Sequence, residues 1–172
     1  CILLGSRGPA SSTPREARAA PRTSTRRSTA PCAGMARAPA RSGEHVIDHL
    51  SLGVADLARA ASFYDAVLAT LGYARVLDHP RAVGWALPGA RDEVFAVLFA
   101  GDRARAPGDG VHVAFAAPDR ASVDAFHAAA LRLGATDEGA PGLRPAYGDD
   151  YYAAFVRDVD GYRIEAVTRA VG

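Results

Sequence analysis

The sequence predicts an α+β fold built from two copies of a β-α-β-β-β module, and an internal repeat is the first indication of it. Three landmark residues of the first copy recur 63 positions later in the second: His49, Asp56 and Phe63 match His112, Asp119 and Phe126. Each copy also begins with an alternating strand pattern followed by a helical pattern, and a strand, turn and strand end the chain. A repeat at a fixed offset is typical of a duplicated structural unit.

The first module is predicted between residues 45 and 100. Residues 45–54 alternate in polarity, as a strand with one buried face does. Asp56 can cap a helix that continues through Leu71, because apolar residues recur there at helical spacing and Gly72 ends the pattern. Three strands are expected to follow, at Tyr73–Leu77, Ala82–Leu87 and Glu93–Ala100.

The second module follows a linker rich in Gly, Pro and Asp at about residues 101–110. It repeats the order of the first, with Asp119 as the helix cap and Gly134 as the stop. Its expected elements are a strand at Val111–Ala117, a helix to about Leu133, and strands near Thr136, at Tyr151–Arg157 and at Tyr162–Thr168.

The dipeptide Asp160-Gly161 is predicted to join the last two strands through a primed two-residue turn, because Gly accepts a positive φ. In the strand that follows, Arg163 and Glu165 share one face. A carboxylate within an apolar strand is a ligand, an ion-pair partner of a residue such as Arg163, or a solvent-facing residue. The strand pattern leaves all three interpretations open.

Composition and charge limit the function classes. With 172 residues and 49% hydrophobic content, the chain can form one domain or two small modules. Residues 1–42 hold eight Arg and one acid, a charge of +7, whereas the remainder holds 12 Arg and 18 acids, a charge of −6. An acidic body argues against a nucleic-acid partner. No apolar run approaches the ~20 residues of a membrane span, and Cys1 and Cys32 offer no disulfide framework, so we expect a cytoplasmic protein.

Residues 1–42 lack hydrophobic periodicity, and the sequence predicts a disordered basic tail there. Met35 is the only methionine, so we expect the natural start at that residue. An Arg-rich transit peptide and a nucleic-acid-binding arm are the alternatives. The predicted organisation is therefore a tail at 1–42, a first module at 43–109 and a second module at 110–172.

A metal site is predicted where the two modules meet. His49 and His112 occupy equivalent strand positions and become neighbours if the modules pair about a pseudo-twofold axis, and the last strand can bring Glu165 to the same place. Two imidazoles and one carboxylate leave several metal positions open. Such a set suits Fe(II) or Mn(II), with Zn(II) or Ni(II) as alternatives. Histidines that are only hydrogen-bonded in a core are the competing interpretation.

Three segments resemble those of a known family: residues 47–57 with Phe63-Tyr64, residues 111–115, and residues 155–165. Together they resemble the vicinal oxygen chelate superfamily, which contains glyoxalases, bleomycin-resistance proteins and extradiol dioxygenases. The resemblance extends over residues 45–169. It implies that the two βαβββ modules pair into a cupped mixed sheet that holds a metal and a small-molecule substrate, and that the protein is a homodimer.

The same resemblance implies roles for particular residues. His49, His112 and Glu165 fall on metal-ligand positions, whereas a fourth ligand position falls on Val97, which cannot coordinate. The metal would hold two vicinal oxygens of the substrate as a Lewis acid. Glu165 is the expected catalytic residue, and Tyr152 or Asp150 are alternative bases.

The reaction stays open at this stage. A lyase or isomerase and a ring-cleaving dioxygenase both fit the resemblance, and a metal-free protein that binds and sequesters a drug is the alternative, in which Arg163 pairs with Glu165. Phe95, Val97 and Phe99 share a face that we expect to point into the cup. With Tyr152 and Arg163 they form the predicted substrate-binding set.

Overall fold

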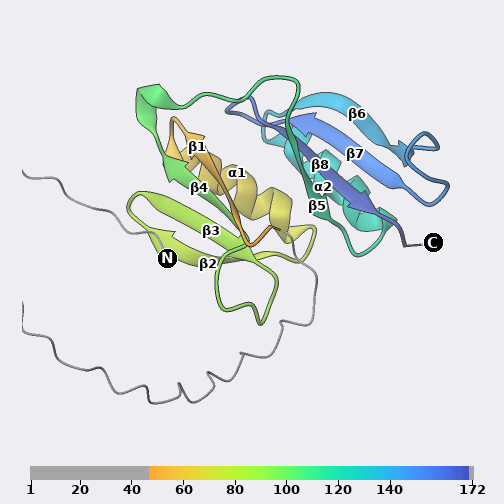
Figure 1. Ribbon diagram of the computed structural model, residues 1–172, viewed down its shortest axis with the longest axis horizontal. Coiled ribbons are helices and arrows are strands. Elements are labelled where there is room, and N and C mark those ends of the chain that lie inside the picture. The colour runs from red at the N-terminus through yellow and green to blue at the C-terminus, as the bar shows by residue number, and fades with distance from the viewer. Residues whose placement is uncertain (1–46, 171–172) are drawn as a thin grey trace, which may run out of the picture. The chain divides into compact units, whose positions relative to one another are not determined.

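The computed structural model describes residues 47–170, which form two four-stranded sheets and two α-helices (Figure 1). The chain divides into two units, Cys1–Ser42 and Gly43–Gly172, and all described residues belong to the second. The predicted tail and the predicted start at Met35 therefore lie outside the described residues. Within residues 47–170, neither helix has the length and apolar character needed to span a membrane.

Each module contains one sheet and one helix. The first consists of β1 (Leu50–Val54), α1 (Leu57–Ala69), β2 (Ala74–His79), β3 (Ala82–Ala86) and β4 (Phe95–Phe99). After a short 3-10 helix, η1 (Gly101–Arg103), the second consists of β5 (His112–Ala116), α2 (Arg120–Arg132), β6 (Thr136–Leu143), β7 (Tyr152–Arg157) and β8 (Arg163–Thr168). The strand orders are β1-β4-β3-β2 and β5-β8-β7-β6, with the first strand of each module parallel to the last. The predicted pair of βαβββ modules is confirmed.

Both helices begin where the sequence predicted, whereas α1 ends at Ala69, two residues before the predicted Leu71. The Asp56 carboxylate accepts a hydrogen bond from the Arg59 N–H at 3.0 Å, and the Asp119 carboxylate accepts one from the Ser122 N–H at 2.7 Å. These bonds satisfy backbone donors that have no partner within a helix. Gly72 follows α1 with a positive φ of 85°, as a left-handed helix stop does.

The first strand is shorter than predicted. The expected strand at residues 45–54 begins only at Leu50, whose N–H donates to the Val94 carbonyl. Because the parallel partner β4 begins at Phe95, residues 47–49 have no strand beside them to pair with. His49 consequently lies just before β1, and residues 45 and 46 lie outside the described residues.

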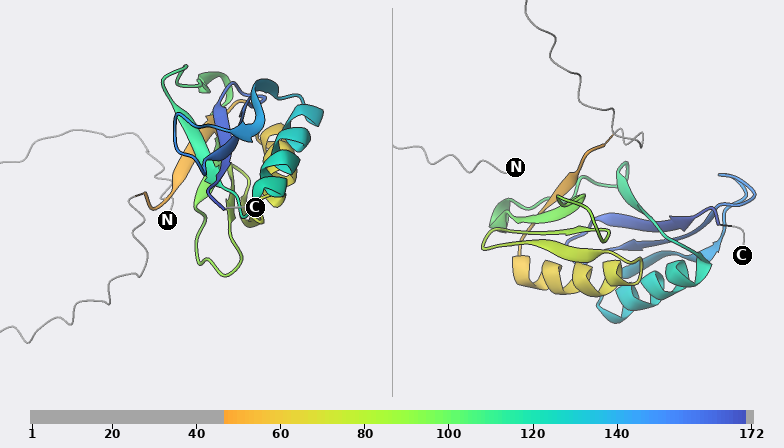
Figure 2. Two further views of the ribbon diagram at one scale, coloured as in Figure 1. Left: turned by 90° about the vertical axis from the view of Figure 1, so that its right-hand side faces the viewer. Right: turned by 90° about the horizontal axis from the view of Figure 1, so that it is seen from below.

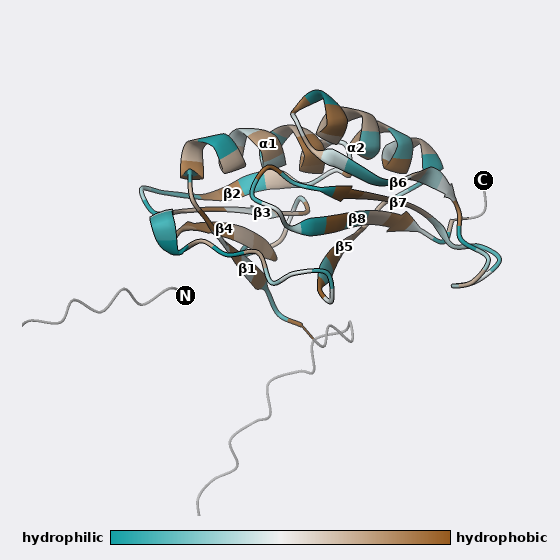
Figure 3. Cartoon of the chain, turned by 90° about the horizontal axis from the view of Figure 1, so that it is seen from above, coloured by the Kyte–Doolittle hydropathy of each residue, from teal (hydrophilic) through white to brown (hydrophobic). Residues whose placement is uncertain are grey.

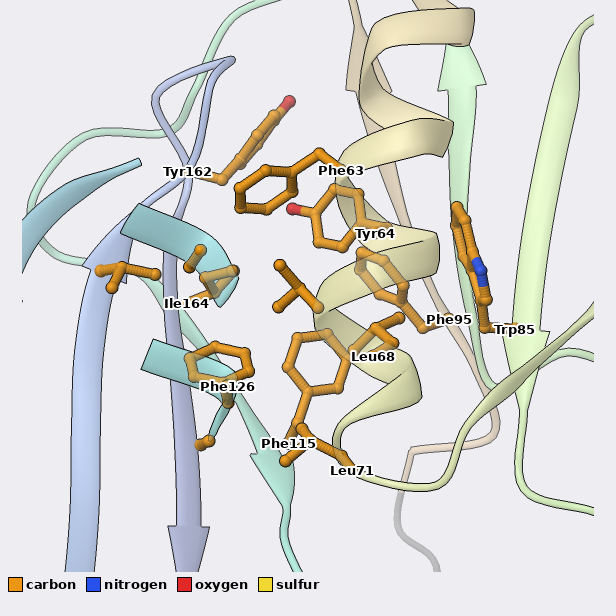
Figure 4. Packing of buried hydrophobic residues seen from close by; sticks show 14 of the residues in the cluster. Phe63, Tyr64, Leu68, Leu71, Trp85, Phe95, Phe115, Phe126, Tyr162 and Ile164 are labelled. Carbon is orange, nitrogen blue, oxygen red and sulfur yellow. The ribbon is translucent and has the colours of Figure 1, made fainter. Parts of the chain in front are cut away.

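The core is continuous between the modules. The two helices lie side by side and cover the same side of the two sheets (Figures 2 and 3). Figure 4 shows aromatic side chains from both modules meeting between them. The Phe95 ring from β4 lies 4.9 Å from Tyr64 and 5.0 Å from Phe115 of β5, the second contact being edge to face. The modules therefore share one hydrophobic cluster.

The turn between β7 and β8 differs from the predicted two-residue turn. A two-residue primed turn with Gly at its second position needs a positive φ at both central residues. Among the described residues only glycines have a positive φ, so Gly161, at 92°, has one and Asp160 does not. The Asp158 N–H donates to the Tyr162 carbonyl at 2.8 Å, which closes a three-residue loop of residues 159–161. A turn followed by a left-handed glycine is a common hairpin of this length.

The Asp158 carboxylate fixes this turn to the first module. Its Oδ2 accepts a hydrogen bond from the Tyr64 hydroxyl of α1 at 2.6 Å. Its Oδ1 accepts from the N–H groups of Asp160, at 2.9 Å, and Tyr162, at 2.7 Å. The Tyr162 hydroxyl in turn donates to the Gly53 carbonyl in β1 at 2.7 Å. Two tyrosines therefore hold the start of β8 against β1 and α1.

Replacing Tyr64 with Phe tests this contact. Tyr64→Phe leaves the buried Oδ2 of Asp158 without a donor, and an unsatisfied buried acceptor costs about 1–3 kcal/mol. Tyr152→Phe is the matched control, because it removes an exposed hydroxyl contact with Asp124 that water can replace, and we expect a change within about 0.5 kcal/mol. Urea unfolding measures both, and equal losses would contradict the role of Tyr64.

The pH dependence of stability tests the burial of Asp158. Burial raises the pKa of its carboxyl group, although hydrogen bonds from Tyr64, Tyr162 and Asp160 oppose the shift. A raised folded-state pKa means that this group contributes less stability as pH rises from about 4, the ordinary carboxyl range, through the raised value. The free energy of unfolding of the wild type, relative to Asp158→Asn, should therefore fall across that window. A difference that is constant with pH would show that Asp158 does not titrate as inferred.

Candidate functional site

A group of three polar side chains in contact lies on the face of the second sheet that is turned away from α2. Glu165 of β8 is paired in register with Ala114 of β5 and with Phe155 of β7. Its Oε2 lies 3.1 Å from Nε2 of His112. Its Oε1 accepts a hydrogen bond from the Tyr151 hydroxyl at 2.6 Å. Both carboxylate oxygens of Glu165 therefore have partners.

The charge of Glu165 is buried. Its side chain is 1% exposed, whereas that of His112 is 51% exposed. Arg163, the alternative partner considered from the sequence, instead contacts Glu138, with 2.6 Å between Nε and Oε2. The proposed Arg163–Glu165 ion pair is therefore wrong, and His112 is the ion-pair partner of Glu165 in the described part of the chain.

Tyr151 was not among the residues predicted for the site. Burial, and then the hydrogen bond and charge of Glu165, raise the pKa of Tyr151 to about 12, so its hydroxyl stays protonated and donates. The Arg169 guanidinium lies 4.7 Å from the centre of its ring. Strand parity could have identified Tyr151, because it precedes Ala153 and Phe155 on one face, and Phe155 is paired with Glu165.

The structure does not bring His49 to this group. Its Nδ1 lies 3.1 Å from Oδ2 of Asp48, and both side chains are well exposed. Residues 47–170 contain no cluster of three or more His, Cys, Asp or Glu side chains arranged to hold a metal ion. Of the three predicted ligands, His112 and Glu165 meet, and the role of His49 stays a prediction.

A cavity of about 420 Å³ opens beside His112, along β1 and β5, which are each at one edge of their sheet. Its lining is mainly apolar and comes from both modules: Ile47, Leu50, Leu52, Tyr73, Val94, Phe95, Pro107, Val111, Val113, Ala114, Phe115 and Tyr162. His112 and Arg163 complete the lining. A mainly apolar hollow of this size with a few polar groups is typical of a small-molecule site.

The predicted substrate-binding residues divide between this cavity and other places. Phe95 and Arg163 line the cavity. Val97 is fully buried in the core, Phe99 is 42% exposed, and Tyr152 donates to Asp124. Only two of the five therefore contact the hollow that the structure shows.

The sequence match between Val97 and Glu165 is wrong by one residue. In the first sheet Ser51 pairs with Ala96, and in the second sheet Ala114 pairs with Glu165. Because Ala114 lies 63 residues after Ser51, Ala96 is the true counterpart of Glu165. A slip of one residue reverses the face of a strand. Val97 and Phe95 consequently pack in the core instead of pointing away from α1. Ala96, like Val97, has no side-chain ligand atom.

Comparison with known proteins shows the family. The model of the Glyoxalase/Bleomycin resistance protein/Dioxygenase superfamily matches residues 46–166, so the chain belongs to that superfamily. It is similar to a glyoxalase/bleomycin resistance protein from Albidiferax ferrireducens T118, with 34% identity, a TM-score of 0.62, and coverage of 72% of this chain and 98% of that one. No curated protein matches the chain.

More distant structures share the fold. A glyoxalase/bleomycin resistance protein/dioxygenase family enzyme from Burkholderia phytofirmans PsJN is 16% identical, with a TM-score of 0.55 and coverage of 72% of this chain and 98% of that one. The fosfomycin resistance protein FosX from Mesorhizobium loti is 21% identical, with a TM-score of 0.50 and coverage of 70% and 88%. These structures show a shared fold, and a fold alone does not define the reaction.

The Tyr151 hydrogen bond can be tested by stability. Tyr151→Phe removes a donor from the buried carboxylate of Glu165, and we expect a loss of about 1–3 kcal/mol in the free energy of unfolding. Tyr147→Phe is the matched control, because Tyr147 is 63% exposed and contacts Tyr151 only through its ring, so the change should stay within about 0.5 kcal/mol. Chemical denaturation measures the free energy of unfolding of both variants. If Tyr151→Phe lost no more stability than Tyr147→Phe, the role of Tyr151 would be refuted.

Proposed function

We propose that this chain is a divalent-metal-dependent enzyme that acts on a small oxygenated molecule bound in the cavity between β1 and β5. The observation that carries the proposal is the buried carboxylate of Glu165, whose ion-pair partner within the described chain is the half-exposed imidazole of His112. A buried carboxylate needs a compensating charge. A metal ion bound between the two side chains would supply it.

The donor atoms fit such an ion. An imidazole nitrogen and a carboxylate oxygen are the ligand types that Fe(II), Mn(II), Ni(II) and Zn(II) accept, and their 3.1 Å separation allows both to contact one ion. A coordinating imidazole is neutral at its ligand atom, so it leaves the negative charge of Glu165 available for a cation. His112 and Glu165 would hold the ion, with His49 as the predicted third ligand.

The residues of the chain would orient the site. Tyr151 binds Oε1 of Glu165 and thereby directs Oε2 toward His112, and the apolar cavity walls exclude water from a bound substrate. A bound ion would act as a Lewis acid on the oxygens of the substrate. Glu165 remains the proposed catalytic base of a lyase or isomerase, whereas a ring-cleaving dioxygenase needs fewer protein bases.

A metal-free binding protein is the second candidate. It is favoured by the contacts of both carboxylate oxygens of Glu165 with protein groups, since Oε1 accepts from Tyr151 and Oε2 lies 3.1 Å from Nε2 of His112. In that function the cavity would bind and sequester a drug or another small molecule, and the imidazole would be a hydrogen-bonding partner of Glu165.

A homodimer is also part of the proposal. Three apolar side chains around the cavity are exposed, namely Ile47 at 71%, Val94 at 40% and Val111 at 50%. Exposed apolar side chains grouped on one surface are typical of an interface. Light scattering of the purified chain measures the oligomeric state.

Metal analysis tests the main proposal. Protein purified without a chelating tag should contain about one equivalent of a divalent metal by mass spectrometry, and His112→Ala and Glu165→Gln should each lose it because each removes one donor. His49→Ala tests the predicted third ligand. His79→Ala is the matched control, because His79 is an exposed histidine of β2 and should leave the metal content unchanged.

The outcomes separate the two candidate functions. Iron would favour oxygen chemistry, whereas zinc or nickel would favour a lyase or isomerase. Wild-type protein that contains no metal, and takes up none from Fe(II), Mn(II), Ni(II) or Zn(II), would leave the metal-free binding function.

A further inference from the structure

Two neighbouring residues supply the charged or nitrogen-bearing part of the cavity lining. His112 and Arg163 are register partners on the parallel strands β5 and β8, so their side chains emerge side by side on one face. Among the residues that line the cavity, only these two have nitrogen atoms in their side chains. The rest of the lining is aliphatic or aromatic. Among the lining residues, a ligand that fills the cavity therefore meets side-chain nitrogens only at this pair.

The guanidinium of Arg163 is held in place but keeps a free donor group. Its Nε donates to Oε2 of Glu138 at 2.6 Å, and its Nη1 donates to the Asp109 carbonyl at 2.9 Å. Nη2 has no hydrogen-bond partner among residues 47–170. Two fixed nitrogens orient the third, so little side-chain entropy is lost when a ligand binds.

Nearby acids do not cancel the charge of Arg163. Glu138 also pairs with Arg157, at 2.6 Å between Nη2 and Oε1, so two guanidinium groups share one partly buried carboxylate. The carboxylate of Asp109 contacts Arg157 and is 84% exposed, where water screens it. Arg163 therefore retains positive charge toward the cavity.

Another part of the cavity lining is aromatic. The rings of Phe95 and Phe115 lie 5.0 Å apart at an interplanar angle of 87°, and the ring of Tyr73 lies 6.1 Å from Phe115. All three residues line the cavity. Aromatic rings arranged edge to face offer further edges and faces to a planar ring.

We propose that the ligand of this cavity is a ring-bearing carboxylate, with its carboxylate on Nη2 of Arg163 and its ring against Phe95, Phe115 and Tyr73. This inference rests on the proposed function in placing the ligand in the cavity and adds the chemical class of that ligand. The side chain of His112 lies next to the same carboxylate. Arg163 thereby selects an anion, and the aromatic part of the lining selects a ring.

Calorimetric titration of the full chain with matched probes tests the proposal. We expect 3-phenylpropanoate to bind about tenfold more tightly than the neutral 3-phenylpropan-1-ol, because a hydrogen bond to a charged group discriminates by about that factor. Acetate has the charge without the ring and should bind too weakly to detect. Equal affinity for the acid and the alcohol, or equal affinity for acetate and phenylpropanoate, would overturn the proposal.

Two arginine variants identify the residue responsible. Arg163→Gln should abolish the preference for the acid over the alcohol. Arg75→Gln is the matched control, because Arg75 also pairs with a carboxylate, that of Asp65, but does not line the cavity, and it should keep the preference. A preference that survives in Arg163→Gln, or disappears in Arg75→Gln, would contradict the assignment. If circular dichroism shows that Arg163→Gln does not fold, the wild-type comparison of acid and alcohol decides.

The same titrations distinguish this inference from the metal proposal. They are run on protein dialysed against a chelator and again on protein loaded with Mn(II), and the Arg163-dependent preference should appear in both. Metal content should be unchanged in Arg163→Gln. A preference for the acid over the alcohol without any metal uptake would support the ligand class and contradict the metal proposal. Metal uptake without that preference would support the metal proposal and contradict the ligand class.

Discussion

The hydrogen bond between Tyr64 and Asp158 is the contact on which the arrangement of the two modules depends. It joins the middle of α1 to the turn that leads into β8, and it lies at the edge of a shared aromatic core. Burial raises the pKa of the Tyr64 hydroxyl well above its ordinary range, so the hydroxyl remains a donor. Because an unsatisfied carboxylate oxygen at this buried position is costly, the turn has one favourable position against the first module.

The position of this turn has consequences for the candidate site. β8 begins directly after Tyr162, whose hydroxyl is bonded to the backbone of β1, and Glu165 follows within the same strand. Pairing with β5 then sets His112 and Arg163 side by side at the edge of the cavity. The walls of that cavity come from both modules, so an interaction that fixes one module against the other also fixes the cavity that a ligand would enter.

The two modules differ in the side chains that they have at equivalent positions. The position of Glu165 in the second sheet corresponds to Ala96 in the first, so at this position only the second sheet has a hydrogen-bonded carboxylate. The counterpart of Tyr64 at the 63-residue offset is His127, which contacts Asp137 of its own module and, within residues 47–170, makes no hydrogen bond to the other module. One copy therefore contributes mainly core and cavity wall, and the other contributes the polar group. This division is consistent with a site that is not symmetric although the backbone is.

Local chemistry explains what the sequence alone determined. Helix caps at Asp56 and Asp119, glycine stops, alternating strands and the 63-residue repeat act over a few residues or at a fixed offset, so the fold and most element bounds were predictable. Tertiary structure decided the rest: the bonding of Tyr151 to Glu165, the pairing of Arg163 with Glu138, the one-residue register of β4, and the place of His49 outside β1. Each depends on which strand lies beside which, and strand register is set by pairing between distant segments that no local pattern records.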